Sequence, residues 1–192
     1  MAIPVSVLQS TSPGSVIELF SIQLKTALHG ANTLYRFHNG ANLNANGEVV
    51  WAGNSYLRFP IDCSGFEFGS TGTLPRPKIS ISNIFGTITA IMQDVNETTV
   101  GNDLNGATFT RIRTLARYLD AANFTGGTNP FGTPDPTAEF PQEIYFLDRK
   151  VTETRDIVTW EAQSALDLIN VKLPQRIATK DIFPGIGAFL GF

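Results

Sequence analysis

Apolar and polar residues alternate in several segments of this chain, a period that is typical of half-buried β-strands. Residues 16–24 are mostly branched and aromatic, which predicts a core strand, and the sequence predicts that they pair with residues 33–38 across His29-Gly30. Residues 144–151 and 156–162 predict a second hairpin with a charged turn. The pattern therefore indicates a mainly β protein, an antiparallel barrel or sandwich with one or two short helices.

The stretch from Trp51 to Phe85 gives the clearest strand and turn signals. Gly53-Asn54 predicts a tight hairpin turn, since both residue types tolerate positive φ. The alternation in residues 65–69 predicts another strand. In residues 78–82 the alternation predicts that Ile79 and Ile81 face the core, with Pro77 at a strand start or edge.

Residues 84–94 carry a helical period instead. Ile84, Ile88, Ile91 and Met92 recur at the spacing of one helix face, which predicts a short amphipathic helix packed on the sheet, and Asn83 is a suitable cap.

Residues 108–119 fit both periods. As a strand, they would place Arg111, Arg113 and Arg117 on one face. As a helix, they would align Ile112, Leu115, Ala116 and Leu119, and the period alone favours the helix in the second half of the segment.

Two further segments differ in composition from the strands. Residues 123–137 are rich in Gly, Thr and Pro and predict a long surface loop. Residues 177–192 form an apolar extension almost without charge. We therefore expect a single β domain over residues 1–176, followed by the extension, which packs either on its own domain or on a partner.

Composition limits the possible functions. The formal net charge of −3 argues against general nucleic-acid binding, which needs a basic excess. No run is long enough to span a bilayer, and the N-terminal residues lack the features of a secretory signal. We therefore expect neither a nucleic-acid partner nor stable insertion into a membrane.

The sequence offers no convincing catalytic or metal site. Cys63 is the only cysteine, and we interpret it as a small packed residue and not as a nucleophile. A metal site needs three or four converging donors, and no motif supplies these around His29 or His38. No motif pairs the available carboxylates, so we assign no catalytic, cofactor or metal residue. These carboxylates are Asp62, Glu67, Asp103 and Glu143.

Several ordered motifs together resemble the phage minor tail protein L family, whose members are tail-tip components of long, non-contractile phage tails. The motifs are Trp51, Gly53 and Tyr56; Gly65-Phe66-Glu67; Arg76-Pro77; Ile81-Ser82-Asn83; Arg111 and Arg113 leading to residues 116–124; Ser164-Ala165-Leu166-Asp167; and Leu173-Pro174-Gln175-Arg176.

The resemblance implies a structural virion protein that catalyses nothing. It implies a β-barrel hub domain beneath the distal tail ring, which helps to adapt the six-fold tube to a three-fold central hub that carries host recognition. The implied partners are further copies in a ring, as a trimer, together with the distal tail protein and the central hub or tail-fibre protein. The implied location is the virion tail tip, assembled in the host cytoplasm. The resemblance also implies a strand at residues 108–119.

The chain departs from the family pattern near its end. Family members commonly continue into a small C-terminal domain whose cysteines hold an iron–sulfur cluster, whereas residues 177–192 contain no cysteine. Either this member lacks that domain or the chain shown stops short of it, and we expect no cofactor in this chain.

The residues predicted to contact partners are basic or aromatic. The arginines of residues 111–117 have two open interpretations, a solvated face or ion pairs with carboxylates of a neighbouring subunit. A competing hypothesis is a carbohydrate-binding β-sandwich that uses Trp51, Tyr56 or Trp160 as stacking platforms. The predicted partner contacts are Arg76, Lys78, Arg111, Arg113, Arg117, Phe131, Phe183, Phe189 and Phe192.

Overall fold

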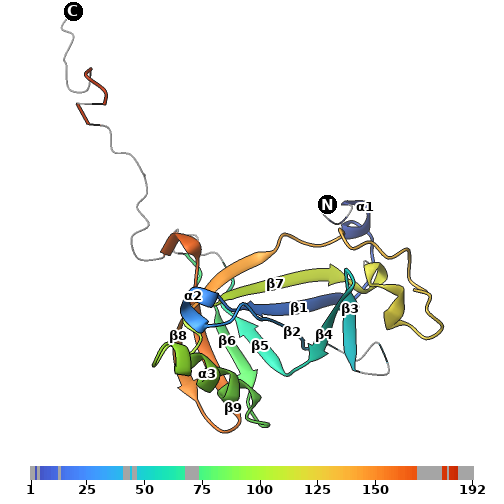
Figure 1. Ribbon diagram of the computed structural model, residues 1–192. Coiled ribbons are helices and arrows are strands. Elements are labelled where there is room, and N and C mark those ends of the chain that lie inside the picture. Colours follow the sequence, from blue (N-terminus) through green and yellow to red (C-terminus); the bar gives the residue numbers. More distant parts are fainter. Residues whose placement is uncertain are drawn as a thin grey trace, which may run out of the picture.

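A computed structural model describes residues 3, 5–12, 14–40, 44, 47–67, 74–167, 179–180 and 182–185. In this part of the chain, nine strands form one sheet in the order β3-β4-β2-β1-β7-β8-β9-β6-β5 (Figure 1). The strands are β1 (Val16–Gln23), β2 (Leu34–His38), β3 (Glu48–Trp51), β4 (Asn54–Arg58), β5 (Ile61–Ser64), β6 (Lys78–Ser82), β7 (Thr108–Leu115), β8 (Glu143–Glu153) and β9 (Ile157–Gln163).

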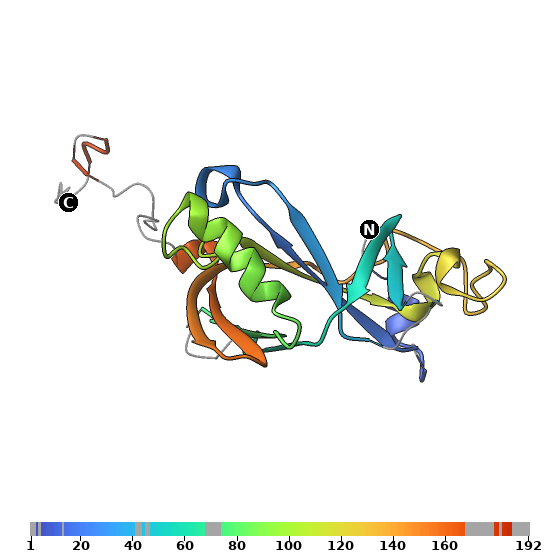
Figure 2. The same cartoon turned by 60° about the horizontal axis from the view of Figure 1, so that its bottom comes forward.

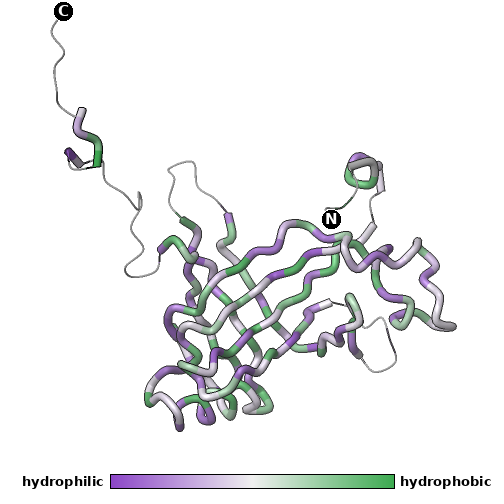
Figure 3. The backbone as a smooth tube through the Cα atoms, turned by 45° about the horizontal axis from the view of Figure 1, so that its top comes forward, coloured by the Kyte–Doolittle hydropathy of each residue, from purple (hydrophilic) through white to green (hydrophobic). Residues whose placement is uncertain are grey.

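The predicted mainly β fold is confirmed, and the sheet is open, with β3 and β5 as its edges. Both predicted hairpins form, because β1 pairs with β2 and β8 pairs with β9, each antiparallel. The pairing of β2 with β4 is parallel, which makes the sheet mixed. Figure 3 shows hydrophobic and polar positions alternating along the strands.

One helix of the described chain is longer than a single turn. This is α3 (Thr87–Thr98), which lies beside the β8–β9 hairpin in Figures 1 and 2. The remaining helical segments are α1 (Val5–Leu8), α2 (Thr26–His29) and the 3-10 turns η1 (Ala116–Tyr118), η2 (Ala121–Asn123) and η3 (Ala165–Asp167). No helix among the described residues has the length and apolar character needed to cross a membrane.

The predicted helix starts later than the sequence suggested. Its N-cap is Gly86, whose φ of 68° is left-handed, and Asn83 lies outside the helix. The Asn83 side chain still accepts a hydrogen bond from the Thr89 amide in the first turn, at 3.2 Å. Ile88 and Met92 are buried as predicted, but Ile84 is 64% exposed, so its placement in the buried stripe was wrong.

Strand β1 contributes to two separate cores because its adjacent residues face opposite sides of the sheet. Phe20 belongs to the larger core, which β5, β6, β8, β9 and α3 complete around Trp160. Leu19 belongs to a smaller core with Trp51 and Tyr56 of the β3–β4 hairpin. Ile79 and Ile81 are fully buried in the larger core, which confirms their predicted orientation.

Residues 108–119 are a strand followed by a turn. The expectation from the family resemblance is confirmed over β7, whose eight residues pair along β1. The helical period in the second half corresponds only to the 3-10 turn η1.

Two turn and strand predictions were wrong in detail. The β3–β4 turn consists of Ala52 and Gly53, with φ of 51° and 73°, because Trp51 pairs with Asn54. Residues 65–67 are not a strand, since β5 ends at Ser64. Phe66 instead reaches the face of β7 and β8, where its ring contacts Arg111 and Tyr145. The remainder of that predicted strand lies outside the described residues.

The β3 edge of the sheet is covered by the side chain of Asn123. Its Oδ1 accepts a hydrogen bond from the Val50 amide at 2.6 Å, and its Nδ2 donates to the Val50 carbonyl at 2.7 Å. Asn123 is fully buried. An amide side chain thus takes the place of a further strand.

Replacing Asn123 by alanine should lower the free energy of unfolding by about 1–3 kcal/mol, because both Val50 groups lose their partner. Urea unfolding of wild type and variant measures the difference. Asn54→Ala is the matched control, since Asn54 donates only one exposed hydrogen bond, to Ala52. Equal losses in the two variants would contradict the proposed role of Asn123.

The carboxylates that form ion pairs affect how the stability of the folded protein depends on pH. A hydrogen bond from Asn96 holds the pKa of Asp103 below its usual 3.8. Hydrogen bonds from Lys150 and Arg149 hold the pKa values of Glu153 and Glu161 below the usual 4.5. A lowered folded-state pKa contributes stability that is complete above the unfolded value and is lost as the pH falls through the folded value.

The free energy of unfolding should therefore decrease as the pH falls. The lowered pKa of the buried His38 removes stability below about pH 6.5, and the carboxylate pairs remove more below about pH 4. Each pair is partly exposed and contributes about 1 kcal/mol or less. Urea midpoints measured across this range provide the test. An increase in stability between about pH 5 and pH 3 would be inconsistent with these pairings.

Candidate protein-contact site

The predicted partner-contact residues lie in separate parts of the structure. Arg76 and Lys78 flank the start of β6, and Arg111 and Arg113 lie in β7. Arg117 and Phe131 line one cavity at the far end of the molecule. Phe183 is 54% exposed in the C-terminal extension, while Phe189 and Phe192 lie outside the described residues.

Arg76 is the centre of an ion-pair network. Its guanidinium lies 2.5 Å from Asp167, 3.6 Å from Glu161 and 3.7 Å from Asp148. Pro77 carries the backbone into β6, which places the Arg76 side chain opposite the β8–β9 hairpin. Its charge is therefore balanced within the chain, while Lys78 next to it is exposed.

The arginines of β7 form ion pairs with carboxylates of the same chain. Arg111 binds Glu18 of β1 and Glu143 of β8, the latter at 3.0 Å, because β7 lies between these two strands. Arg113 binds the other oxygen of Glu143 at 2.9 Å. The Phe66 ring covers the Arg111 guanidinium, 4.5 Å from centroid to carbon. Neither of the two interpretations left open by the sequence, a solvated face or ion pairs with a neighbouring subunit, included these internal pairs. Contact of these arginines with a partner stays a prediction.

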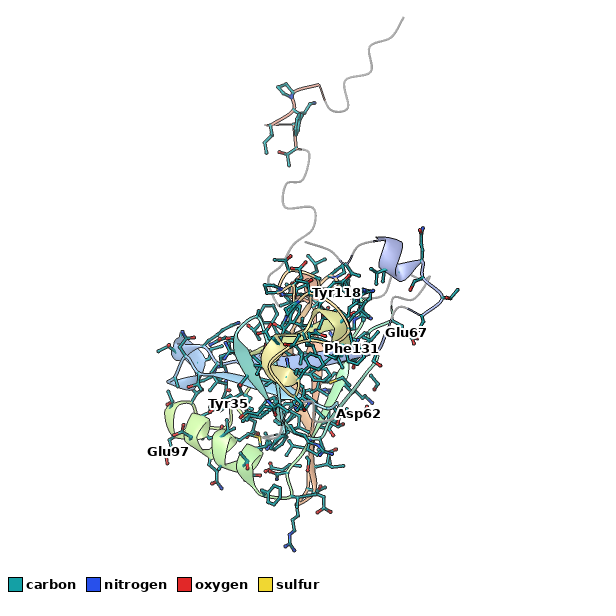
Figure 4. All side chains as sticks on the ribbon, turned by 90° about the vertical axis from the view of Figure 1, so that its right-hand side faces the viewer. Tyr35, Asp62, Glu67, Glu97, Tyr118 and Phe131 are labelled. Atoms are coloured by element: carbon teal, nitrogen blue, oxygen red, sulfur yellow. The ribbon has the colours of Figure 1, made fainter. Side chains whose placement is uncertain are left out.

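Arg117 and Phe131 form the walls of a cavity of about 400 Å³ at the end of the molecule that faces the viewer in Figure 4. Its lining residues define what we call the Arg117 socket. In the described part of the chain, they are Ser12, Gly14, Ser15, Ala116, Arg117 and Phe131. Phe131 is 62% exposed and rests on the Phe124 ring at a centroid distance of 5.8 Å.

Asn129 fixes the loop that carries the socket. Its side chain donates to the carbonyls of Arg117 and Leu119, both at 3.0 Å, and its Oδ1 accepts from the Phe131 amide at 2.9 Å. The predicted surface loop therefore has a buried polar anchor, because Asn129 is only 8% exposed. The exposed Phe131 ring is held in a defined position.

One exposed apolar turn was not predicted from the sequence. Phe85 is 88% exposed and Ile84 is 64% exposed, between β6 and α3. Next to them, a groove of about 370 Å³ is lined by residues of β5, β6 and β9 together with Ile84. Ser80, Ser82 and Ile157 are among its lining residues. The signal in the sequence is the pair of apolar residues before Gly86, a pattern that is as compatible with a turn as with the start of a helix.

The carboxylates considered for catalysis are not brought together. Asp103 pairs with Lys150 at 2.9 Å, whereas Glu143 pairs with Arg111 and Arg113. Within the described residues, no group of three or more His, Cys, Asp or Glu side chains is placed to hold a metal ion.

Both histidines are buried and hydrogen-bonded. His29 Nδ1 accepts from the Lys25 amide at 2.8 Å, and His38 Nδ1 accepts from the Gly40 amide at 3.2 Å. Burial lowers the pKa of His38. Both side chains thus stabilise turns.

The three aromatic residues considered as platforms for stacking a carbohydrate are buried. Trp51, Tyr56 and Trp160 are 2%, 4% and 0% exposed, respectively. A sugar ring needs an accessible aromatic face, which these core residues do not offer.

Cys63 does not suit either catalysis or an iron–sulfur cluster. Burial raises the pKa of its thiol to about 12, although the nearby Arg111 acts in the opposite direction. A cluster is held by several thiolates, and this sequence contains one cysteine. The residues of this chain therefore do not fit the group.

We expect Cys63 to react with a thiol reagent at pH 8 roughly a thousandfold more slowly in the folded protein than in urea, because the thiolate is the reactive form. Absorbance of the released reagent product gives both rates. Similar rates in the two states would show that the thiol is accessible and ionised in the fold.

Comparison with known proteins agrees with the resemblance seen in the sequence. The profile of a family described as Phage minor tail protein L matches residues 26–185. The chain is 39% identical to tail tip protein L of Escherichia phage lambda over 93 residues. That match covers 48% of this chain and 37% of the lambda protein. Because the family profile matches most of its length, this chain belongs to the phage minor tail protein L family.

Proposed function

We propose that this chain is a structural subunit of a phage tail tip, where it joins the distal tail ring to the central hub and supports tail assembly and host attachment. The observation that carries the proposal is the family match over residues 26–185, which includes the sheet from β2 to β9. A similar protein, tail tip protein L of phage lambda, has the tail tip in its name.

The proposed partners are other copies of the chain in a ring, arranged as a trimer, together with the distal tail protein and the central hub or tail-fibre protein. The tail tip of the virion is the proposed location, after assembly in the host cytoplasm. The proposal includes no catalysis, no bound cofactor, no nucleic-acid partner and no stable membrane insertion.

The distribution of exposed apolar groups supports a subunit with several contacts. Phe85 and Phe131 are exposed aromatic residues on turns fixed by hydrogen bonds. Ile182 and Phe183 add a third exposed apolar group, at 55% and 54% exposure. Aromatic anchors of this kind are typical of protein interfaces.

A phage that carries a nonsense codon early in the gene for this chain tests the proposal. In a non-suppressing host, we expect tails to fail in assembly or to lack a tip, and the chain supplied from a plasmid should restore infectious particles. Purified virions should contain the chain at the distal end of the tail, detected with a labelled antibody. Normal infectious virions without the chain would overturn the proposal.

A further inference from the structure

The turn from Asn83 to Gly86 presents two apolar side chains to solvent on a rigid support. The Gly86 amide donates to the Asn83 carbonyl at 2.7 Å, which closes a turn with Ile84 and Phe85 at its central positions. Asn83 itself is 5% exposed, and its amide donates to the Asp156 carbonyl at 2.7 Å. Its side chain also donates to Thr89 Oγ1 at 2.8 Å.

This support matters because a preorganised aromatic side chain binds with little loss of conformational entropy. Phe85 is 88% exposed, so nearly all of its apolar surface is available for burial against another protein. We call Ile84 and Phe85 the Phe85 knob.

The Arg117 socket offers a matching concave surface. Its volume of about 400 Å³ exceeds the size of one aromatic side chain, and the Phe131 ring forms one wall. Asn129 fixes the carbonyl of Arg117 on one side and the Phe131 amide on the other. Arg117 makes no ion pair within the described part of the chain, and its guanidinium lies 5.7 Å from the centre of the Tyr118 ring.

Charge also matches between the two surfaces. Asp156 lies beside the knob, because its carbonyl binds the Asn83 amide and both Asp156 and Ile84 line the same groove. Among the described residues, Asp156 has no ion-pair partner, as is true of Arg117. A carboxylate beside the knob and a guanidinium in the socket are complementary.

The two surfaces lie at different ends of the chain. Figures 1 and 2 both show α3 and the β8–β9 hairpin at one end and the yellow segment around η1 and η2 at the other. The knob therefore cannot fill the socket of its own chain, but it can fill that of another copy. Contacts between two different surfaces are heterologous and close into a ring when the rotation permits.

We propose that the Phe85 knob of one copy inserts into the Arg117 socket of the next copy, with Asp156 of the first facing Arg117 of the second. This inference rests on the proposed function, since it assigns the surfaces through which copies of the chain meet in the ring. The ring contact consists of an aromatic anchor and one charge pair, the residue types that dominate binding energy at interfaces.

Cysteine cross-linking in purified phage particles tests the contact. Ile84→Cys and Ser15→Cys, introduced together with Cys63→Ser, leave the Phe85 ring in place and put one thiol on the knob and one in the socket. Mild oxidation should join the copies into covalent oligomers on a non-reducing gel. The matched control is Val100→Cys with Ser15→Cys, because Val100 is 93% exposed but lies after α3, outside the knob.

Covalent oligomers with Ile84→Cys but not with Val100→Cys would support the contact. Equal cross-linking in both particles, or none in either, would overturn it. Particles that lack the chain altogether would instead overturn the proposed function, so the two failures are distinguishable.

Charge reversal provides an independent readout of the same pair. Asp156→Arg and Arg117→Asp should each lower the yield of infectious particles by about tenfold or more, and the combination should recover most of the loss. Arg155→Asp, at the neighbouring position, is the control and should leave the yield unchanged. Failure of the combined variant to recover, with all proteins soluble and folded, would overturn the proposed charge pair.

Discussion

Replacing Trp160 by alanine should lower the free energy of unfolding by about 3–5 kcal/mol. Trp160 is fully buried in β9, between its neighbours Ile79 of β6 and Lys150 of β8. Its indole Nε1 donates to the Asp103 carbonyl at 3.0 Å. The substitution removes a large apolar side chain, leaves a cavity in the larger core and takes away the partner of a backbone carbonyl.

Urea unfolding followed by circular dichroism measures this loss. Trp160→Phe separates the two causes, because it keeps most of the ring volume and loses the hydrogen bond. Val100→Ala is the control, since Val100 is 93% exposed and its change should stay within about 0.5 kcal/mol. A loss below about 1 kcal/mol for Trp160→Ala would show that β9 does not pack as described.

Replacing Arg111 by methionine should cost about 2–4 kcal/mol at neutral pH. Methionine keeps the apolar stem but removes the charge that lies between Glu18 and Glu143. The Arg111 side chain is only 15% exposed, and the Phe66 ring covers its guanidinium. Glu18 would then lose its ion-pair partner, and Glu143 would keep only Arg113.

A second substitution identifies the cause. If the loss comes from leaving Glu18 without its partner, adding Glu18→Gln to Arg111→Met should cost little more, or recover part of the loss. Arg155→Met is the control, because Arg155 is exposed in the β8–β9 turn and makes no ion pair in the described chain. An equal loss in Arg111→Met and Arg155→Met would contradict the proposed role of Arg111.

Local patterns in the sequence were enough to predict the hairpins and the orientation of core residues such as Ile79 and Ile81, because strand alternation depends only on neighbours along the chain. The order of the strands depends on distant contacts. The parallel pairing of β2 with β4, for example, has no signal in either segment. The β3–β4 turn was shifted by one residue because Ala52 adopts a φ of 51°, which turn preferences assign to Asn or Gly.

The contact residues were predicted less completely than the fold. An exposed Phe131 follows from a long polar loop, but the Asn129 anchor that positions it is a tertiary contact. The carboxylates of Arg111 lie 93 and 32 residues away in sequence, so only the sheet order reveals them. Phe85 was missed because the helical period of Ile88 and Met92 was extended backwards across Gly86.

Electron microscopy of intact virions tests the central claim most directly, namely that this chain is a subunit of the tail tip. We predict density for the nine-stranded sheet at the distal end of the tail, with several copies in a ring and the Phe85 knob of each copy against residues 116–131 of its neighbour. A tail tip fully accounted for by other proteins, with no density for this domain, would contradict the claim.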